Sequence, residues 1–293
     1  MIRTTSLTKR FGRTLAVDNV SLDIAEGESV ALWGANGAGK STILRCALGL
    51  LRYKGRVEVA GLDARTRGKQ VRALIGYVPQ ELAFYDDLAV AEAIRFFASL
   101  KGLRRTNTHD ALARVGLDGH ARKRVRELSG GMKQRLALAV ALLAQPRVLI
   151  LDEVTASLDA VGRDEFVALL ASLSRSGLTM LFASHRAEEI TTLASRVVIL
   201  ERGRVAHELP ASAFLAHLKL ESVLHLRLAH AAEAIRLLKQ HGFDARMNGV
   251  GVLVPVPQGQ KAAPFRILAE GRVSVDDFHV VPLSRAAEEG PRA

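Results

Sequence analysis

The sequence has few of the features that mark a secreted, thiolate-based metal-binding or membrane-spanning protein. Cys46 is the only cysteine among 293 residues, so an intramolecular disulfide and a metal site made of several thiolates are excluded. The longest uninterrupted apolar run, residues 136–144, is far shorter than the ~20 residues that cross a bilayer. The first residues contain no apolar segment typical of a signal peptide. We therefore expect a chain that stays in the cytosol unless another protein holds it at a membrane.

Apolar residues and positive charge are plentiful. Hydrophobic residues make up 48% of the chain, which predicts a globular core, and the net charge is +11. Residues 1–206 contain 31 basic and 21 acidic side chains, whereas residues 207–293 contain 10 and 9. Ten of the basic residues lie within 101–135. Such a concentration indicates either an acidic partner (nucleic acid, anionic lipid or an acidic protein surface) or simply a solvated face.

The hydrophobic pattern of the first two hundred residues predicts an α/β fold. Short, continuous apolar runs are typical of parallel strands that are buried on both faces, and segments with helical periodicity separate them. An antiparallel element precedes this mostly parallel sheet. The expected strands are 20–24, 29–33, a strand from 57, 75–78, 148–151, 179–183 and 197–200. The expected helices are one from Lys40 through 44–51, then 90–101, 107–115, 131–144, 160–175 and 186–194.

The pattern changes after about residue 209. The strands 222–228, 243–247, 250–256 and 273–281 alternate with the helices 231–241 and 259–269. This order, β-α-β-β-α-β, is that of a small α+β domain with a ferredoxin-like arrangement. The near-neutral charge and Pro210 favour a boundary near 205–220, and we expect one domain over 1–206 and a small accessory or regulatory domain over 207–293.

One glycine-rich segment follows the strand that ends at Trp33 and precedes a helix. It fits the pattern G-x-x-x-x-G-K-[ST], in which backbone N–H groups and a helix N-terminus surround a phosphate. Lys40 is then expected to reach the β- and γ-phosphates, and the Ser41 hydroxyl to bind Mg²⁺. The predicted nucleotide-binding residues of the segment are Gly34, Ala35, Asn36, Gly37, Ala38, Gly39, Lys40, Ser41 and Thr42.

Two carboxylates end the apolar run 148–151. Asp152 and Glu153 follow four apolar residues, so a buried strand presents both at its carboxyl end. Asp152 is the expected Mg²⁺ partner, and Glu153 is expected to polarise an attacking water. A pair of helix-capping residues is the structural alternative, but it does not explain why both carboxylates end an apolar strand.

Together with further short motifs, these two segments resemble ABC ATPases. Residues 128–135, Leu-Ser-Gly-Gly-Met-Lys-Gln-Arg, resemble the signature motif of that family, and Gln80 resembles its Q-loop glutamine. Ser157-Leu158-Asp159 resembles the D-loop, and His185 resembles the switch histidine. Phe11 falls where the family keeps an aromatic residue that stacks on adenine. The motifs occur in the family's order, and the resemblance covers roughly residues 2–206.

The resemblance implies a P-loop cassette with a mixed sheet and a helical subdomain at about 81–135. It implies ATP and Mg²⁺ as ligands, with Ser41, Gln80 and Asp152 at the metal. It also implies that Lys40, Glu153 and His185 are catalytic. Met132 replaces a usual glutamine and Val154 a usual proline, but neither position supplies a catalytic group.

One chain contains one phosphate loop and one signature. In the family, the signature of one cassette closes over the ATP held by another, so the resemblance implies a head-to-tail homodimer. Its signature residues Ser129, Gly130 and Gly131 would contact nucleotide and, with Asp159, lie at the dimer interface. A helix N-terminus at Ser129 suits an anion.

The segment 88–102 resembles the one that follows the Q-loop in ABC-2-type export ATPases, including the copper-maturation type, and residues 275–278 faintly resemble a stretch near their C-termini. The resemblance implies a separate transmembrane permease, contacted by the helical subdomain, and a peripheral position on the cytoplasmic side of the membrane.

The alternative is a soluble ABC ATPase that acts on nucleic acid or ribosomes. Translation-factor members of the family carry two cassettes in one chain, and repair members insert a long coiled coil between the cassette halves. This chain has one cassette and only 88 residues between Lys40 and Ser129, so the resemblance implies that nucleic acid is not its partner.

The last part of the chain is rich in histidine. Only His225 and His230 approach the spacing of metal ligands, and a predicted boundary between strand and helix separates them. We therefore interpret these histidines as scattered surface or core residues. The six are His207, His217, His225, His230, His241 and His279.

Overall fold

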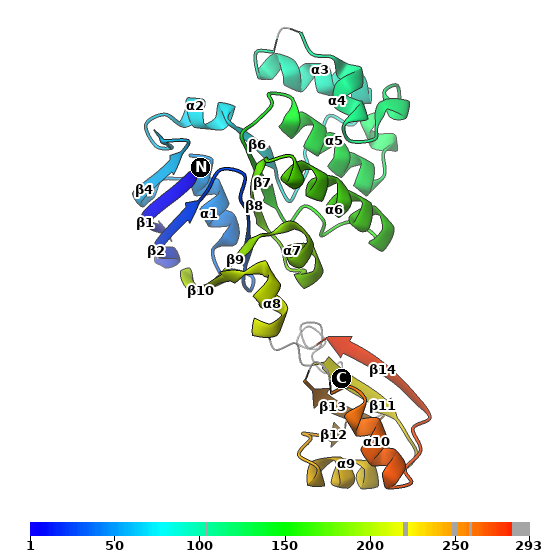
Figure 1. The fold of residues 1–293 in the computed structure, drawn as a ribbon. Coiled ribbons are helices and arrows are strands. Elements are labelled where there is room, and N and C mark those ends of the chain that lie inside the picture. Colours follow the sequence, from blue (N-terminus) through cyan, green and yellow to red (C-terminus); the bar gives the residue numbers. More distant parts are fainter. Residues whose placement is uncertain (104, 219–221, 248–250, 258–259, 283–293) are drawn as a thin grey trace. The chain divides into compact units, whose positions relative to one another are not determined.

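The fold is taken from a computed structural model that describes residues 1–103, 105–218, 222–247, 251–257 and 260–282. The chain forms two compact units, Met1–Phe214 and Leu215–Ala293. Figure 1 shows the helices and strands of each unit. In the described residues, no helix has the length and apolar character needed to cross a membrane.

A six-stranded sheet forms the centre of the first unit. Its strand order is β10-β9-β3-β8-β7-β6. All neighbouring strands are parallel except β9 and β10, which are antiparallel. The apolar runs therefore form the predicted parallel sheet, and β3, β7 and β8 lie side by side with their carboxyl ends at one edge. The bounds are β3 Ser29–Trp33, β6 Ile75–Val78, β7 Val148–Asp152, β8 Thr179–Ala183, β9 Arg196–Glu201 and β10 Arg204–Pro210.

A second, antiparallel sheet precedes it, with the strand order β2-β1-β4-β5. Its strands are β1 Ile2–Phe11, β2 Thr14–Ile24, β4 Lys54–Val59 and β5 Leu62–Asp63. The predicted strand 20–24 is the last part of β2. Ser6 and Asn19 have φ of +48° and +52°, and the register between β1 and β2 shifts between Thr4 and Leu7. These irregularities twist the hairpin and break its alternation.

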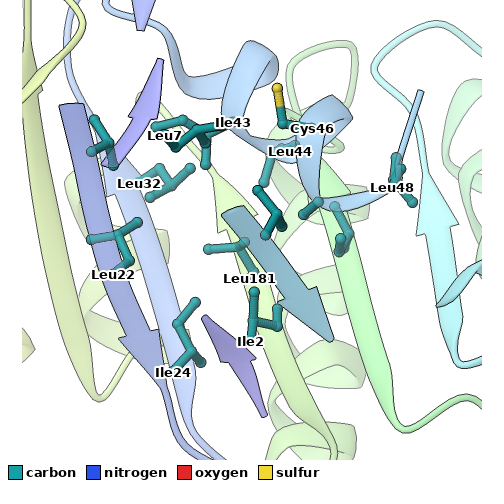
Figure 2. Packing of buried hydrophobic residues seen from close by; sticks show 14 of the residues in the cluster. Ile2, Leu7, Leu22, Ile24, Leu32, Ile43, Leu44, Cys46, Leu48 and Leu181 are labelled. Atoms are coloured by element: carbon teal, nitrogen blue, oxygen red, sulfur yellow. The ribbon is translucent and has the colours of Figure 1, made fainter. Parts of the chain in front are cut away.

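Helix α1 (Lys40–Ala47) packs between the two sheets, since it contacts β2 and β4 on one side and β7 and β8 on the other. Figure 2 shows this core: Leu22 and Ile24 from β2, Leu32 and Leu181 from the central sheet, and Ile43 and Leu44 from α1. Cys46 is buried in the same cluster. Because the helix that follows the phosphate loop is fixed on both sides, the loop has a rigid support.

The helix α1 is shorter than the pattern predicts. It ends at Ala47, and Gly49 has φ of +66°. A Cβ atom at Gly49 would lie 2.5 Å from the carbonyl oxygen of Ala64, so the chain turns there and only glycine fits. Helices α3, α6 and α7 lie within one residue of their predicted bounds, α5 ends two residues before its predicted end, α4 is shorter than predicted, and α2 was not predicted. Their bounds are α2 Gly68–Ala73, α3 Val90–Leu100, α4 Thr108–Ala113, α5 Gly130–Leu142, α6 Ala160–Arg175 and α7 Ala187–Leu193.

Helices α3, α4 and α5 form a group that lies apart from β1, β2 and β4 in the first unit (Figure 1). The group includes two short 3-10 helices, Asp118–His120 and Val125–Glu127. It contains the segment from Glu81 to Arg135 that was expected to be a helical subdomain, and α5 continues from it toward the central sheet, where it contacts β6.

The two units divide after Phe214, within the region near 205–220 that the charge and Pro210 favour but later than the predicted domain end at residue 206. Strand β10 pairs with β9, so residues 207–210 belong to the central sheet. Helix α8 (Ala211–His217) begins directly afterwards, and the ring of Phe214 packs edge-on against Trp33 with 5.1 Å between the ring centroids. Both contacts bind this segment to the first unit.

The second unit has the predicted order β-α-β-β-α-β. Its sheet has the strand order β12-β13-β11-β14, and all neighbouring strands are antiparallel. The bounds are β11 Ser222–Arg227, α9 Ala231–Gln240, β12 Arg246–Met247, β13 Val252–Val256, α10 Ala263–Glu270 and β14 Asp277–Pro282. The predicted ends at residues 250 and 259 lie outside the described residues. Leu224, Val254 and Leu238 are among the side chains of its own hydrophobic core.

Candidate functional site

The glycine-rich loop between β3 and α1 has the shape that binds a phosphate. Gly34 and Gly39 have φ of +154° and +103°. A Cβ atom at Gly34 would lie 2.4 Å from the carbonyl oxygen of Leu200, and one at Gly39 would lie 2.5 Å from that of Ala16. No larger residue fits at either position. Residues 35–37 are exposed, so the loop presents its backbone to solvent directly before the N-terminus of α1.

Lys40, the first residue of α1, folds back over this loop. Its buried side chain donates hydrogen bonds to the carbonyl oxygens of Gly34, at 2.8 Å, and Ala35, at 3.2 Å. Burial lowers the pKa of Lys40, although Glu153 and Asp152 act in the opposite direction. The ammonium group is therefore held where a phosphate in the loop would lie, and it is poorly hydrated there, which strengthens its attraction for an anion.

Asp152 and Ser41 form a second contact beside the loop. The Ser41 hydroxyl donates to Asp152 Oδ1 at 2.9 Å. Asp152 is only 1% exposed, and its other oxygen, Oδ2, is buried without a hydrogen-bond partner in the part of the chain that the structure describes. Burial raises the pKa of this carboxyl group, and the hydrogen bond from Ser41 opposes the rise. A hydroxyl and an unsatisfied carboxylate are oxygen ligands that suit Mg²⁺, so this pair fits the metal that the sequence predicts.

Glu153 contacts three other predicted site residues. One of its carboxylate oxygens, Oε1, lies 2.7 Å from His185 Nε2 and 3.7 Å from Lys40 Nζ. The other, Oε2, accepts a hydrogen bond of 3.4 Å from Gln80. Glu153 has φ of +50°, and its backbone N–H donates to the carbonyl oxygen of Ala183 at 3.1 Å. Strands β6, β7 and β8 thus bring their carboxyl ends together, and the structure joins Gln80, Glu153 and His185 in one cluster beside Lys40.

The predicted signature residues lie elsewhere on the first unit. Ser129 caps α5 by accepting a hydrogen bond from the N–H of Met132 at 3.3 Å, and Ser129 and Gly130 are exposed. Among the described residues, no hydrogen bond or ion pair joins Ser129, Gly130 or Gly131 to the phosphate loop. The structure therefore provides an open helix N-terminus that is separate from the loop of its own chain.

Two further predicted residues lie at the surface. Asp159 caps α6 by accepting a hydrogen bond of 2.8 Å from Gly162 N–H. Phe11 ends β1 and is 49% exposed, with Lys9 Nζ 4.5 Å from the centre of its ring. The hairpin that carries Phe11 borders the loop through Ala16, whose carbonyl oxygen faces Gly39. An exposed aromatic ring on this hairpin is available for stacking.

Sequence reasoning missed a buried carboxylate beside the cluster. Glu189, in the first turn of α7, is 5% exposed and accepts hydrogen bonds from the hydroxyls of Thr155 and Ser184. The available signal was its place four residues after His185. Charged residues are almost never fully buried unless they are paired, and Glu189 is paired with these two hydroxyls.

In the second unit, the register of the sheet brings two histidines together that are far apart in the sequence. His225 and His279 lie opposite each other on β11 and β14, with 4.5 Å between ring centroids. Sequence spacing instead singled out His225 and His230, and His230 precedes α9 as its N-cap residue. In the described ranges, no group of three or more possible metal ligands occurs.

A P-loop cassette with a separate, exposed signature helix defines the class of nucleotide-binding proteins to which the first unit belongs. Residues 17–156 match the family described as ABC transporter. The bacitracin transport ATP-binding protein BcrA of Bacillus licheniformis is 32% identical over 284 residues, which cover 94% of this chain and 91% of BcrA. The sulfate/thiosulfate import ATP-binding protein CysA of Burkholderia mallei is 38% identical, over 95% of this chain and 84% of CysA.

Solved structures show the same cassette. The ATP-binding cassette MJ0796, determined as a dimer bound to ADP and Pi, has a TM-score of 0.64 and 27% identity, and the match covers 72% of this chain and 99% of MJ0796. The chain therefore belongs to the ATP-binding subunits of ABC transporters, which are ATP-hydrolysing transport ATPases.

Proposed function

We propose that this chain works as a homodimer that hydrolyses two ATP molecules and drives separate transmembrane permease subunits from the cytoplasmic face of the membrane. The observation that carries the proposal is the convergence of Lys40, Asp152, Glu153 and His185 beside a phosphate-shaped loop. These groups come from α1, β7 and the end of β8, so only the folded sheet assembles them.

Each group has a role that its geometry suits. Lys40 binds the β- and γ-phosphates, because its ammonium is already aimed into the loop. Ser41 and Asp152 hold Mg²⁺, with Gln80 nearby, and the ion would supply charge neutralisation at the phosphates. Glu153 accepts the proton of the attacking water, and His185, 2.7 Å away, orients that carboxylate and contacts the γ-phosphate.

The arrangement of the signature supports the dimer. Ser129, Gly130 and Gly131 form an exposed helix N-terminus that attracts an anion, but the structure holds them apart from their own loop. A second copy turned head to tail would bring this helix end to the γ-phosphate, and the MJ0796 dimer is a precedent for two cassettes. Asp159 at the start of α6 and Phe11 on the β1–β2 hairpin are then at the interface and at adenine, respectively.

The helical group supports the permease. Phe84 and Tyr85, before α3, form edge-to-face contacts with Phe96 and Phe97 in the second half of that helix, and Phe96 contacts Phe97, with 5.3–5.8 Å between ring centroids. Tyr85 and Leu100 are 63% and 67% exposed. An exposed tyrosine and an exposed leucine on an aromatic cluster, beside a basic segment, favour a docking surface.

For the direction of transport we propose export, on the resemblance of residues 88–102 to export ATPases. CysA carries the word import in its name, and BcrA carries transport, so relatives of both kinds support the transporter and leave the direction to experiment. Uptake or extrusion of a labelled substrate in cells that express the chain with its permease decides it.

The test of the hydrolytic site is Glu153→Gln. The amide keeps the shape of the side chain and cannot accept the proton, so we expect ATP binding to persist while kcat falls at least about a hundredfold. The trapped ATP-bound dimer should be visible as a doubling of mass by light scattering. Turnover close to that of the unchanged chain would refute the role of Glu153.

Measurements of nucleic-acid binding and of permease association distinguish the transporter from a soluble ABC ATPase that acts on nucleic acid. Salt-sensitive, sub-micromolar binding to duplex DNA or RNA, together with no association with a permease in membranes, would refute the transport assignment.

A further inference from the structure

The buried carboxylate of Glu189 is shared between the loops that follow β7 and β8. Thr155 Oγ1 donates to Glu189 Oε1 at 2.6 Å, and Ser184 Oγ donates to Oε2 at 2.7 Å. Arg186 Nε lies 3.7 Å from Oε1. Each carboxylate oxygen is thus engaged by a different loop, and Glu189, Thr155 and Ser184 are all buried, whereas the Arg186 side chain is partly exposed.

The two loops are those that carry the central pair of the site. Thr155 follows Glu153 by two residues, and Ser184 immediately precedes His185. The contact of 2.7 Å between Glu153 and His185 therefore depends on how these loops are held relative to each other. Glu189 contacts neither of the two side chains itself.

The contact requires a carboxylate and not just any polar group. Ser184 Oγ accepts a hydrogen bond from the N–H of Arg186 at 3.0 Å, so its own hydrogen is available for Glu189. An amide at this position would present one acceptor and one donor group in place of two acceptors. One of the two hydroxyls would then lose its acceptor or face a competing donor in a buried place.

We propose that Glu189 is a positioning residue for hydrolysis, which fixes the distance between Glu153 and His185 by fastening their loops to the first turn of α7. The proposal rests on the proposed function, because it assigns Glu189 a role only through those two residues. It predicts that loss of the contact slows the chemical step and leaves nucleotide binding by the phosphate loop intact, since Lys40 and Ser41 have no bond to Glu189.

The test compares Glu189→Gln with Glu188→Gln in the full chain. Glu188 lies beside Glu189 in the same turn but is exposed, so the control makes the same change in charge near the same helix end. We expect Glu189→Gln to lower kcat about ten- to a hundredfold relative to the control, the effect of a lost hydrogen bond to a charged group. The Kd for ATP should equal that of the control, and the unfolding midpoint should fall while staying above the assay temperature.

A second variant covers the case in which Glu189→Gln does not fold. Thr155→Val keeps the side-chain shape, removes one of the two hydroxyl contacts and leaves Ser184 bound. We expect it to lower kcat about three- to tenfold with unchanged Kd for ATP.

The decisive readout is the double variant with His185→Ala. If Glu189 acts through the Glu153–His185 contact, adding Glu189→Gln to His185→Ala should lower kcat little further. Fully additive losses, a weakened Kd for ATP, or normal kcat in both Glu189→Gln and Thr155→Val would overturn the proposal. Because Glu153→Gln tests the site directly, a dead Glu153 variant beside a normal Glu189 variant refutes only the positioning role, whereas a normal Glu153 variant refutes the proposed function.

Discussion

The buried carboxylate of Asp152 should destabilise the ligand-free fold although the proposed function needs it to hold Mg²⁺, and this can be measured. Its carboxylate is 1% exposed, receives one hydrogen bond from Ser41, and leaves Oδ2 without a partner among the described residues. Asp152→Asn removes the charge and keeps the acceptor for Ser41. In EDTA at pH 7 we therefore expect the variant to be more stable than the unchanged chain.

The expected gain in stability follows from the direction in which the pKa of Asp152 is shifted. Burial raises the pKa of Asp152 above that of the unfolded chain, so the folded protein binds the proton more tightly and stability falls as pH rises through the folded pKa. At pH 7 the ionised group opposes folding. Neutralising an unsatisfied buried group is worth about 1–2 kcal/mol. For a unit of this size, that raises the unfolding midpoint by about 2–8 °C.

The assay is urea and thermal unfolding of both chains, first in EDTA and then with Mg²⁺ and a slowly hydrolysed ATP analogue. The order should reverse with the ligands, because binding to the folded state stabilises by mass action and only the carboxylate can hold the metal well. Asp118→Asn, an exposed aspartate of the same unit, is the control and should change neither midpoint. A lower stability of Asp152→Asn in EDTA would refute the argument that this carboxylate is unsatisfied.

Three further outcomes are expected. Cys46, fully buried and with its pKa raised by burial to about 11, should react with a thiol reagent at pH 8 only as fast as the chain unfolds. Arg196→Gln should cost about 1 kcal/mol at pH 7, after allowance for solvent screening. Burial of Glu28 acts to raise its pKa, but Arg196 holds it below the ordinary value, so this loss should shrink as pH falls below about 4. A chain that ends at residue 218 should still bind ATP in an equilibrium titration, since every site residue lies before residue 206.

A different result would refute each of these three predictions. Labelling of Cys46 faster than unfolding would show that α1 opens locally. A loss of stability in Arg196→Gln that is equal at pH 3 and pH 7 would mean that the ion pair with Glu28 is not its cause. A folded, monodisperse chain of 1–218 that binds no ATP would show that the second unit completes the nucleotide site.

The motifs and the parallel sheet could be predicted because their signals are local. The loop at 34–42 and the carboxylates at 152–153 each follow a short apolar run, and a buried strand that ends in polar residues is recognisable without its neighbours. That β3, β7 and β8 are adjacent follows from the fold class, and adjacency brings the ends of parallel strands together. The direct contact between Lys40 and Glu153 is a consequence of that adjacency.

The features that were missed depend on irregular backbone or on distant pairing. In β1 the apolar residues Ile2 and Leu7 are both buried although five positions apart, because the bulge at Ser6 shifts the alternation. A search for period two fails there. His225 meets His279 through the register of β11 and β14, which no local spacing reveals.

The contacts within the proposed site also indicate how nucleotide would prepare it for hydrolysis. Lys40 and His185 both contact Glu153 Oε1, so two donors engage the oxygen that should accept a proton from water. A triphosphate in the loop would attract Lys40 away from Glu153. His185 would stay beside Glu153 and keep the carboxylate oriented, so that Glu153 Oε1 loses a competing cation and becomes available to water. Binding of the substrate by Lys40 would thus couple nucleotide binding to the readiness of Glu153.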